Sequence, residues 1–246
     1  MRLYIVLPGG ASGVFDQRFT PARISYRVRG ARLYRARDAG RDHGGIMVLS
    51  ISGYTGGGPA SALLDEIESE ISARGFEGVV LDSGESSSAL HASLAGRLAS
   101  DIAPYPVFVP EALGSNAPRT FVLIQTALSG GNLVRRLSDA AERFGADRLA
   151  LECDRLRMEF RLPCPEGAGA ELDAGRFDEL RERAKLAFFS DALCVNYFYR
   201  GDGDSRSVVL FDDAESMRKK LNAAEALGIS SAFLFYPRMR DILHEL

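Results

Sequence analysis

Six polar side chains that can exchange protons or hydrogen bonds stand at or near the ends of short apolar runs: Asp82, Glu85, Glu111, Gln125, Glu152 and Asp154. Two carboxyl groups placed on either side of a substrate can act as general acid and general base. Three or four carboxyl groups gathered at the opening of one cavity would suit a cation, a basic ligand or a sugar. The competing interpretation is a set of solvated loop positions, and for Asp82 a cap on the loop or helix that follows.

The composition excludes several classes of function. The chain has 246 residues and a net charge of −3, so it lacks the basic excess that a nucleic-acid surface or an anionic membrane surface needs. No segment approaches the roughly 20 apolar residues of a membrane helix. Three cysteines without metal-type spacing and three isolated histidines predict no metal site, and we expect no other cofactor.

The same features bear on location. The first ten residues, MRLYIVLPGG, carry too short an apolar stretch for a secretory signal, and the odd number of cysteines fits buried thiols in a reducing compartment. We therefore expect a cytoplasmic protein, and association with the spore or the cell envelope stays open. The residues leave the oligomeric state undetermined.

Short apolar runs alternate with segments of helical periodicity, which is the pattern of successive strand–helix units. The predicted strands are residues 3–7, one strand within 23–37, 46–52, 79–82, 107–110, 121–126, 148–153 and 231–236. About eight core strands predict an α/β fold, a (β/α)8 barrel of TIM type, formed by residues 1–246 as a single domain. The first units are abbreviated, because the segment around residues 23–37 lacks a crossover helix.

The strand–helix rhythm breaks after the seventh predicted strand. An alternating strand, a turn rich in glycine and alanine, a short helix and two strands around the turn GDGDS follow it. This pattern predicts a small α+β insertion with a hairpin at residues 155–208. The rhythm resumes with a helix that begins at Asp213 and ends at Gly228.

Two stretches resemble glycoside hydrolase family 18, the chitinase-like family that includes a bacterial spore-envelope branch. Within residues 194–236, the segment VLFDDAES at 209–216 and the lysines after it are similar to the family's V-W-F/Y-D/E-D-x-x-S segment, which precedes a helix and the last strand. The segment GFEGVVLDSGES, residues 75–86, resembles the strand-four motif F-D-G-x-D-x-D-x-E. The insertion after strand seven is also similar to that of the family.

The resemblance implies substrate-assisted hydrolysis, in which the N-acetyl group of the sugar attacks its own anomeric carbon. The protein would supply a general acid, the glutamate that ends the strand-four motif. Inward-facing aspartates would hold the proton of that acid and orient the acetamido group. A tyrosine and an aspartate of strand six and a tryptophan of the last strand would complete the site. The implied ligands are saccharides of the chitin or peptidoglycan type.

The strand-four motif of this sequence departs from the family pattern. Side chains alternate along a strand, so Val80, Asp82 and Gly84 should point inward; valine then replaces one aspartate, and glycine stands at the position of the acid. Glu85 is displaced by one residue. It would reach the site only if the strand has ended at Ser83–Gly84, since glycine permits a sharp turn.

Other positions of the implied site are changed as well. The tyrosine and aspartate of strand six correspond to Ala127 and Leu128, which carry neither a hydroxyl nor a carboxylate. The tryptophan of the last strand corresponds to Phe235, next to Tyr236. An aromatic floor for a sugar would thus persist, and core packing is the competing interpretation for a phenylalanine on a final strand.

Two functions from different classes follow. The first is a catalytically degenerate barrel that binds a saccharide, or acts as a structural or interaction protein, with these ligand contacts: Glu111, Gln125, Glu152, Phe235 and Tyr236. The second is an active glycosidase that uses Glu85 as general acid together with Asp82. A barrel with unrelated chemistry also stays open, because a fold does not determine a function.

Overall fold

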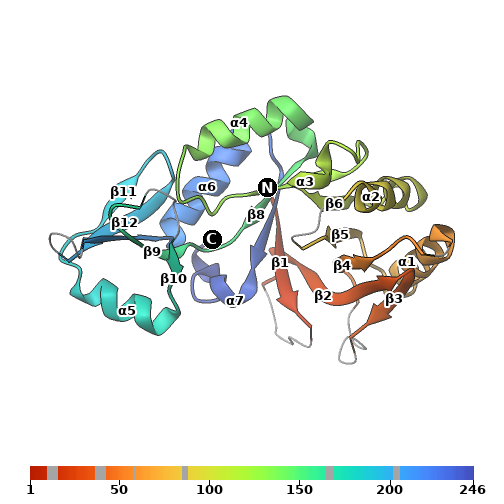
Figure 1. Cartoon of the computed structure of the whole chain (residues 1–246), viewed down its shortest axis with the longest axis horizontal. Helices are drawn as coiled ribbons and strands as arrows, with labels where there is room; N and C mark the ends of the chain where they lie inside the picture. Colours follow the sequence, from red (N-terminus) through yellow and green to blue (C-terminus); the bar gives the residue numbers. More distant parts are fainter. Residues whose placement is uncertain (10–15, 37–42, 58, 85–87, 165–168, 202–205) are drawn as a thin grey trace.

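The structure, a computed structural model, describes residues 1–9, 16–36, 43–57, 59–84, 88–164, 169–201 and 206–246. Eight parallel strands form a closed barrel in the order β1 (Arg2–Pro8), β2 (Phe19–Gly30), β4 (Ile46–Tyr54), β5 (Gly78–Asp82), β6 (Val107–Pro110), β7 (Phe121–Gln125), β8 (Leu149–Cys153) and β14 (Ser231–Phe235). Strand β1 closes the ring, because it pairs with β14 on one side and with β2 on the other (Figure 1). The predicted (β/α)8 class is confirmed.

Helices cover the outside of the barrel: α1 (Ala60–Arg74), α2 (Ala89–Asp101), α3 (Glu111–Gly114), α4 (Leu133–Phe144), α6 (Ala214–Ala226) and α7 (Tyr236–Met239), with short 3-10 turns at Ala146–Arg148 and Leu243–Glu245. Each long helix buries an apolar face against the strands, and α1 does so with Leu63, Leu64, Ile67 and Ile71. In the part of the chain that the structure describes, no helix has the length and apolar character needed to cross a membrane.

The first units of the barrel are abbreviated, as the sequence predicts. Between β1 and β4, the described residues 16–36 and 43–45 contain no helix. Strand β2 instead turns at Gly30, where the backbone has φ +61°, and pairs with the short antiparallel strand β3 (Arg32–Arg35). This hairpin extends one wall of the barrel where a crossover helix would otherwise lie.

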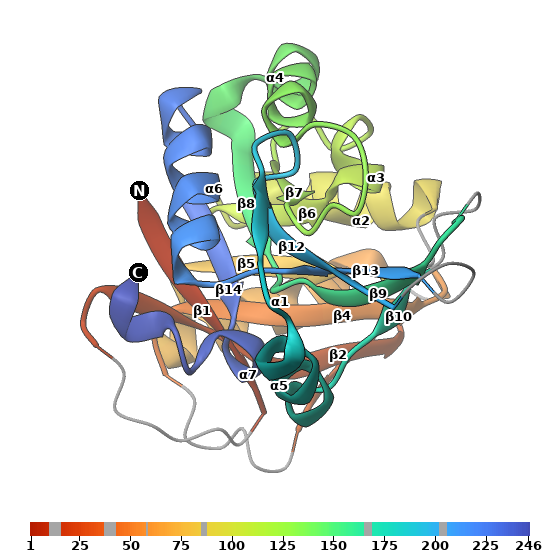
Figure 2. The ribbon, with the colours of Figure 1, turned by 90° about the vertical axis from the view of Figure 1, so that its left-hand side faces the viewer.

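A second sheet occupies the sequence between β8 and α6. Its strands are β9 (Arg157–Arg161), β10 (Ala170–Glu171), β11 (Phe188–Ser190), β12 (Val195–Arg200) and β13 (Ser207–Phe211), all antiparallel, in the order β10-β9-β13-β12-β11. Helix α5 (Ala174–Arg183) packs on one face of this sheet. Figure 1 shows the unit beside the barrel, and in Figure 2 the unit faces the viewer. It is the small α+β insertion expected after the seventh barrel strand.

The side chains inside the barrel form a core of their own. They are Tyr4, Ala22, Ile46, Val48, Val80, Phe108, Leu123, Ala150 and Phe233. The Tyr4 and Phe233 rings are stacked, with centroids 4.4 Å apart, and the edge of Phe108 meets Phe233 at 4.9 Å. Because side chains alternate along each strand, the residues between these ones face the outer helices instead.

A buried ion pair fastens the insertion to the barrel. Asp212 follows β13, and its Oδ2 lies 2.8 Å from Nζ of Lys220 on α6; both side chains are fully buried. The same carboxylate accepts hydrogen bonds from the backbone N–H of Leu156 (3.0 Å) and from the hydroxyl of Ser216 (2.9 Å). Since Leu156 enters the insertion and Asp212 leaves it, these contacts close the unit at its base.

Candidate functional site

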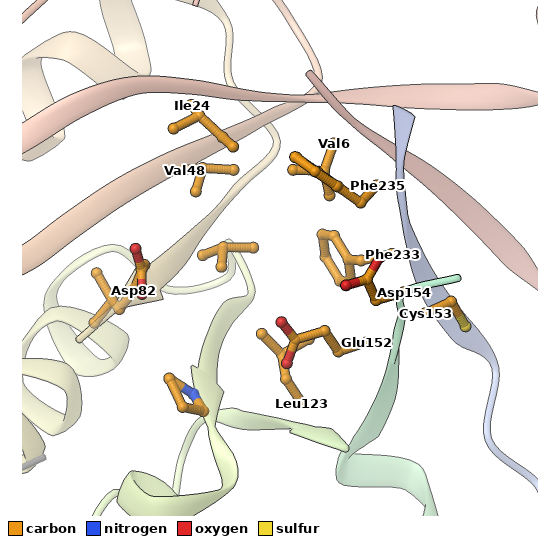
Figure 3. Close-up of a pocket in the computed structure, with 13 residues that line it drawn as sticks. Val6, Ile24, Val48, Asp82, Leu123, Glu152, Cys153, Asp154, Phe233 and Phe235 are labelled. Atoms are coloured by element: carbon orange, nitrogen blue, oxygen red, sulfur yellow. The ribbon is translucent and has the colours of Figure 1, made fainter. Parts of the chain in front are cut away.

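An open cavity of about 330 Å³ lies at the carboxyl ends of the barrel strands, the face on which barrels of this type carry their active sites. Apolar and aromatic side chains make up most of its wall, among them Val48, Val80, Leu123, Phe233 and Phe235. Three carboxylates complete the lining: Asp82, Glu152 and Asp154. Asp82 stands across the cavity from Glu152 and Asp154 (Figure 3).

The end of β5 brings Asp82 into the cavity and turns the chain sharply after it. Val80 and Asp82 both line the cavity, as alternation along the strand predicts. Oδ1 of Asp82 accepts a hydrogen bond from the backbone N–H of Gly84 at 2.9 Å, and Gly84 has a left-handed backbone with φ +58°. Asp82 therefore faces the mouth and also holds the turn that follows. The predicted acid Glu85 lies outside the described residues.

Among the three carboxylates of the cavity, Glu152 has the fewest groups that stabilise its negative charge. It lies on β8, and its carboxylate has no hydrogen-bond or ion-pair partner among the residues that the structure describes. Solvent reaches the side chain, but the walls of the recess replace part of the water around a free carboxylate. This desolvation raises the pKa of Glu152, and the negative charges of Asp154 and Asp82 raise it further.

Replacing Glu152 with glutamine should stabilise the protein at neutral pH. A carboxyl group whose pKa is raised on folding favours the protonated form, so its ionised form costs the folded state free energy above that pKa. Chemical denaturation at pH 7 should show a higher free energy of unfolding for Glu152→Gln than for the wild type. The gain should disappear as the pH falls below the ordinary glutamate value of 4.5.

The matched control removes a carboxylate elsewhere. Glu142 is exposed on α4, and its replacement by glutamine lowers the net negative charge equally. An equal gain in the Glu142→Gln variant would trace the effect to net charge and contradict a local cost at Glu152.

Asp154 has a cationic partner, unlike Glu152. Its Oδ2 lies 3.0 Å from Nη1 of Arg238, and its Oδ1 accepts a hydrogen bond from the backbone N–H of Arg155 at 2.8 Å. Burial raises the pKa of Asp154, and the nearby Arg238 guanidinium opposes that rise. Arg238 also pairs with Glu171 at 2.6 Å, so one guanidinium serves both carboxylates.

Cys153, between these two acids, is not a nucleophile at neutral pH. Burial raises the pKa of its thiol to about 12, so the reactive thiolate is scarcely populated. The side chain is 1% exposed and packs in the core between the strands and the outer helices.

The other residues proposed from the sequence lie at different places. Phe235 lines the cavity. Glu111 begins α3 and accepts a hydrogen bond from Arg136 of α4 at 2.6 Å, so this ion pair holds it in a separate surface groove rather than at the mouth. Gln125 ends β7 beside Glu152 but does not belong to the described lining. Tyr236 packs against the core outside the barrel.

A metal ion has no evident place in this arrangement. Within the described ranges, no three His, Cys, Asp or Glu side chains converge closely enough to hold one. The described side chains of the lining offer a ligand carboxylate oxygens and apolar or aromatic surfaces.

The closed eight-stranded barrel, its cavity at the carboxyl ends of the strands and the α+β insertion after the seventh strand define a (β/α)8 barrel protein with an inserted α+β unit. No protein-family model and no curated protein sequence matches the chain. Solved structures do match it, at low sequence identity and over nearly the whole chain.

Three of these structures illustrate the kinds of protein that share the fold. The spore cortex-lytic enzyme SleL of Bacillus megaterium has a TM-score of 0.63 and 14% identity, over 95% of this chain and 70% of that one. A glycoside hydrolase family 18 N-acetylglucosaminidase of Paenibacillus barengoltzii has a TM-score of 0.65 and 13% identity, over 99% and 98%. A human pseudo-chitinase with retained chitooligosaccharide binding has a TM-score of 0.62 and 12% identity, over 95% and 91%. The chain thus shares its barrel fold with these three proteins.

Proposed function

We propose that the chain is a saccharide-binding protein on a family 18-like barrel that no longer hydrolyses glycosidic bonds. The observation that carries the proposal is the mouth itself, a cavity of about 330 Å³ with an aromatic side, opposed carboxylates and glycine at the position that corresponds to the family's acid. Such a cavity is within the size range of small-ligand sites.

The lining supports sugar binding. Phe235 offers aromatic surface to the apolar face of a sugar ring, and the carboxylates of Asp82 and Glu152 can accept hydrogen bonds from its hydroxyl groups. The human neighbour is a pseudo-chitinase that retains binding of chitooligosaccharides. A barrel of this fold can therefore bind such sugars in a protein that is a pseudo-chitinase.

The changed motif supports the loss of hydrolysis. Val80 lies in the inner core and at the cavity, where the family pattern has an aspartate. Ala127 packs against the core of the insertion, and Leu128 packs against the outer core, so neither provides the implied hydroxyl or carboxylate. General acid catalysis alone contributes about 10²–10⁴-fold to a rate, and its loss removes that share.

One observation favours a second candidate, an active glycosidase that uses Glu85 with Asp82. Strand β5 ends at Asp82, and the left-handed Gly84 turns the chain, which is the condition under which Glu85 could reach the mouth. Chitin-like glycans and peptidoglycan fragments would be its substrates.

A paired assay separates the two candidates. Purified protein is incubated with chitooligosaccharides and with muropeptides, and released reducing ends are measured for the wild type and for Glu85→Gln. We expect both to match the buffer blank. Turnover by the wild type that is lost in Glu85→Gln would establish the second candidate instead.

Binding is tested by calorimetry with partially N-acetylated glucosamine oligomers, which carry both acetamido and amino groups. We expect Phe235→Ala to weaken binding about tenfold, or about 1.4 kcal/mol, because the ring loses its contact with the sugar. Phe188→Ala, on the insertion and 45% exposed, is the matched control and should bind as the wild type does. Absence of binding by the wild type would leave a structural or interaction role.

A further inference from the structure

The described side chains around the cavity differ sharply in what they offer to a ligand. Asp82, Glu152 and Asp154 provide carboxylate oxygens, which at neutral pH accept hydrogen bonds and donate none. The lining side chain with a proton to donate is the Cys153 thiol, which is 1% exposed and engaged with Thr126. The carbonyl oxygen of an acetamido group would need a hydrogen-bond donor, and Cys153 is the one donor among the side chains of the described lining. A charged amino group has only donors to offer, and the carboxylates of the lining can accept from it.

The charges of the lining side chains also favour an amino group over an acetamido group. Asp154 pairs with Arg238, which also pairs with Glu171 at 2.6 Å, whereas Asp82 accepts one backbone N–H and Glu152 has no partner among the described residues. Asp82 and Glu152 thus lie on opposite sides of the cavity, and neither has a cationic partner among the residues that the structure describes (Figure 3). Desolvation, and then the charges of Asp154 and Asp82, raise the pKa of Glu152, and an ammonium group beside this carboxylate would stabilise its ionised form.

We propose that the mouth selects a saccharide with a free, positively charged amino group, such as an N-deacetylated hexosamine unit, over the N-acetylated unit. This inference rests on the proposed function, because it assumes that a sugar occupies the cavity. The ammonium group donates to Glu152, and the ring lies against Phe235. Charge-assisted hydrogen bonds of this kind are the strong ones in proteins.

The cavity and its aromatic side, rather than the carboxylates alone, make this a saccharide site. A divalent metal ion would also neutralise the negative charge of the carboxylates. Such an ion requires several oxygen ligands at about 2.0–2.6 Å around one point. The described acidic side chains do not converge in that way. An ammonium group on a sugar needs only one or two carboxylates, and the apolar wall then contacts the rest of the ring.

The test compares three probes by calorimetry at pH 7: fully deacetylated glucosamine oligomers, fully N-acetylated oligomers of the same length, and calcium chloride alone. We expect the deacetylated oligomers to bind at least about tenfold more tightly than the acetylated ones. Glu152→Gln should abolish that preference, because it should weaken binding of the deacetylated oligomers far more than binding of the acetylated ones. Phe235→Ala should weaken both oligomers together, and the exposed control Glu142→Gln should change neither.

The outcomes distinguish the inference from the proposed function. Equal affinity for both oligomers, or tighter binding of the acetylated ones, overturns the amine preference and leaves saccharide binding intact. A preference that persists in Glu152→Gln also overturns it. Binding of neither oligomer removes both the preference and the proposed function, and binding of calcium alone assigns the carboxylates to a metal site instead. Circular dichroism of each variant excludes misfolding as the cause of lost binding.

Discussion

Lys220→Met should lower the free energy of unfolding by about 3–5 kcal/mol, because removing one partner leaves the other charge buried. Lys220 and Asp212 are both fully buried and 2.8 Å apart. Without the ammonium group, the Asp212 carboxylate keeps only the hydrogen bonds from the Leu156 N–H and the Ser216 hydroxyl. Those two donors do not replace a cation. Urea denaturation followed by circular dichroism measures the loss.

The neighbouring lysine provides a matched control. Lys219 pairs with Glu215 at 2.9 Å across one turn of the helix, in solvent, so Lys219→Met should cost far less than Lys220→Met. The double variant Asp212→Asn/Lys220→Met should recover part of the stability, since it buries no charge and keeps an oxygen for the Leu156 N–H. Equal stability of the two single variants would show that the buried pair does not hold the insertion on the barrel.

Phe108→Ala should cost about 3–5 kcal/mol, through lost burial and the cavity that the missing ring leaves. Phe108 is 2% exposed inside the barrel, and its ring meets those of Tyr4, Phe121 and Phe233 at 5.9, 5.2 and 4.9 Å. At about 2–4 °C per kcal/mol for a chain of this size, the melting temperature should fall by about 6–20 °C. Thermal unfolding measures this directly.

The same substitution on the surface shows whether burial is the cause. Phe188 is 45% exposed on β11, so Phe188→Ala should shift the melting temperature by only a small fraction of that amount. A comparable fall in both variants would contradict the role given to the inner aromatic core. Because Phe108 packs against Phe233, which lines the mouth, the Phe108→Ala variant should also bind saccharide less tightly.

Features that depend on the local periodicity of side chains could be predicted from the sequence. The alternation that points Val80 and Asp82 inward holds in the barrel, and the helix that begins after Asp213 is capped by that residue through a reciprocal pair of hydrogen bonds with Ser216. The break in rhythm after residue 153 marks the insertion. Each of these follows from side chains a few residues apart, whose relation is set by strand or helix geometry.

Which residues line the cavity could not be predicted from the sequence in the same way. Glu111 and Glu152 both stand near the ends of apolar runs, yet Arg136 holds Glu111 in another groove while Glu152 faces the cavity. The pairing of Asp154 with Arg238 joins two segments on either side of the insertion, and no local pattern marks it. These contacts depend on where helices and loops meet after the barrel closes.

The sequence by itself therefore determined the eight strands, the insertion and the residues of β5 that face inward, because these follow from the period of side chains along one element. Tertiary structure alone decided which carboxylates share the mouth and which of them lack a cation. The physical reason is that charge compensation depends on distances between distant segments, and closure of the ring sets those distances.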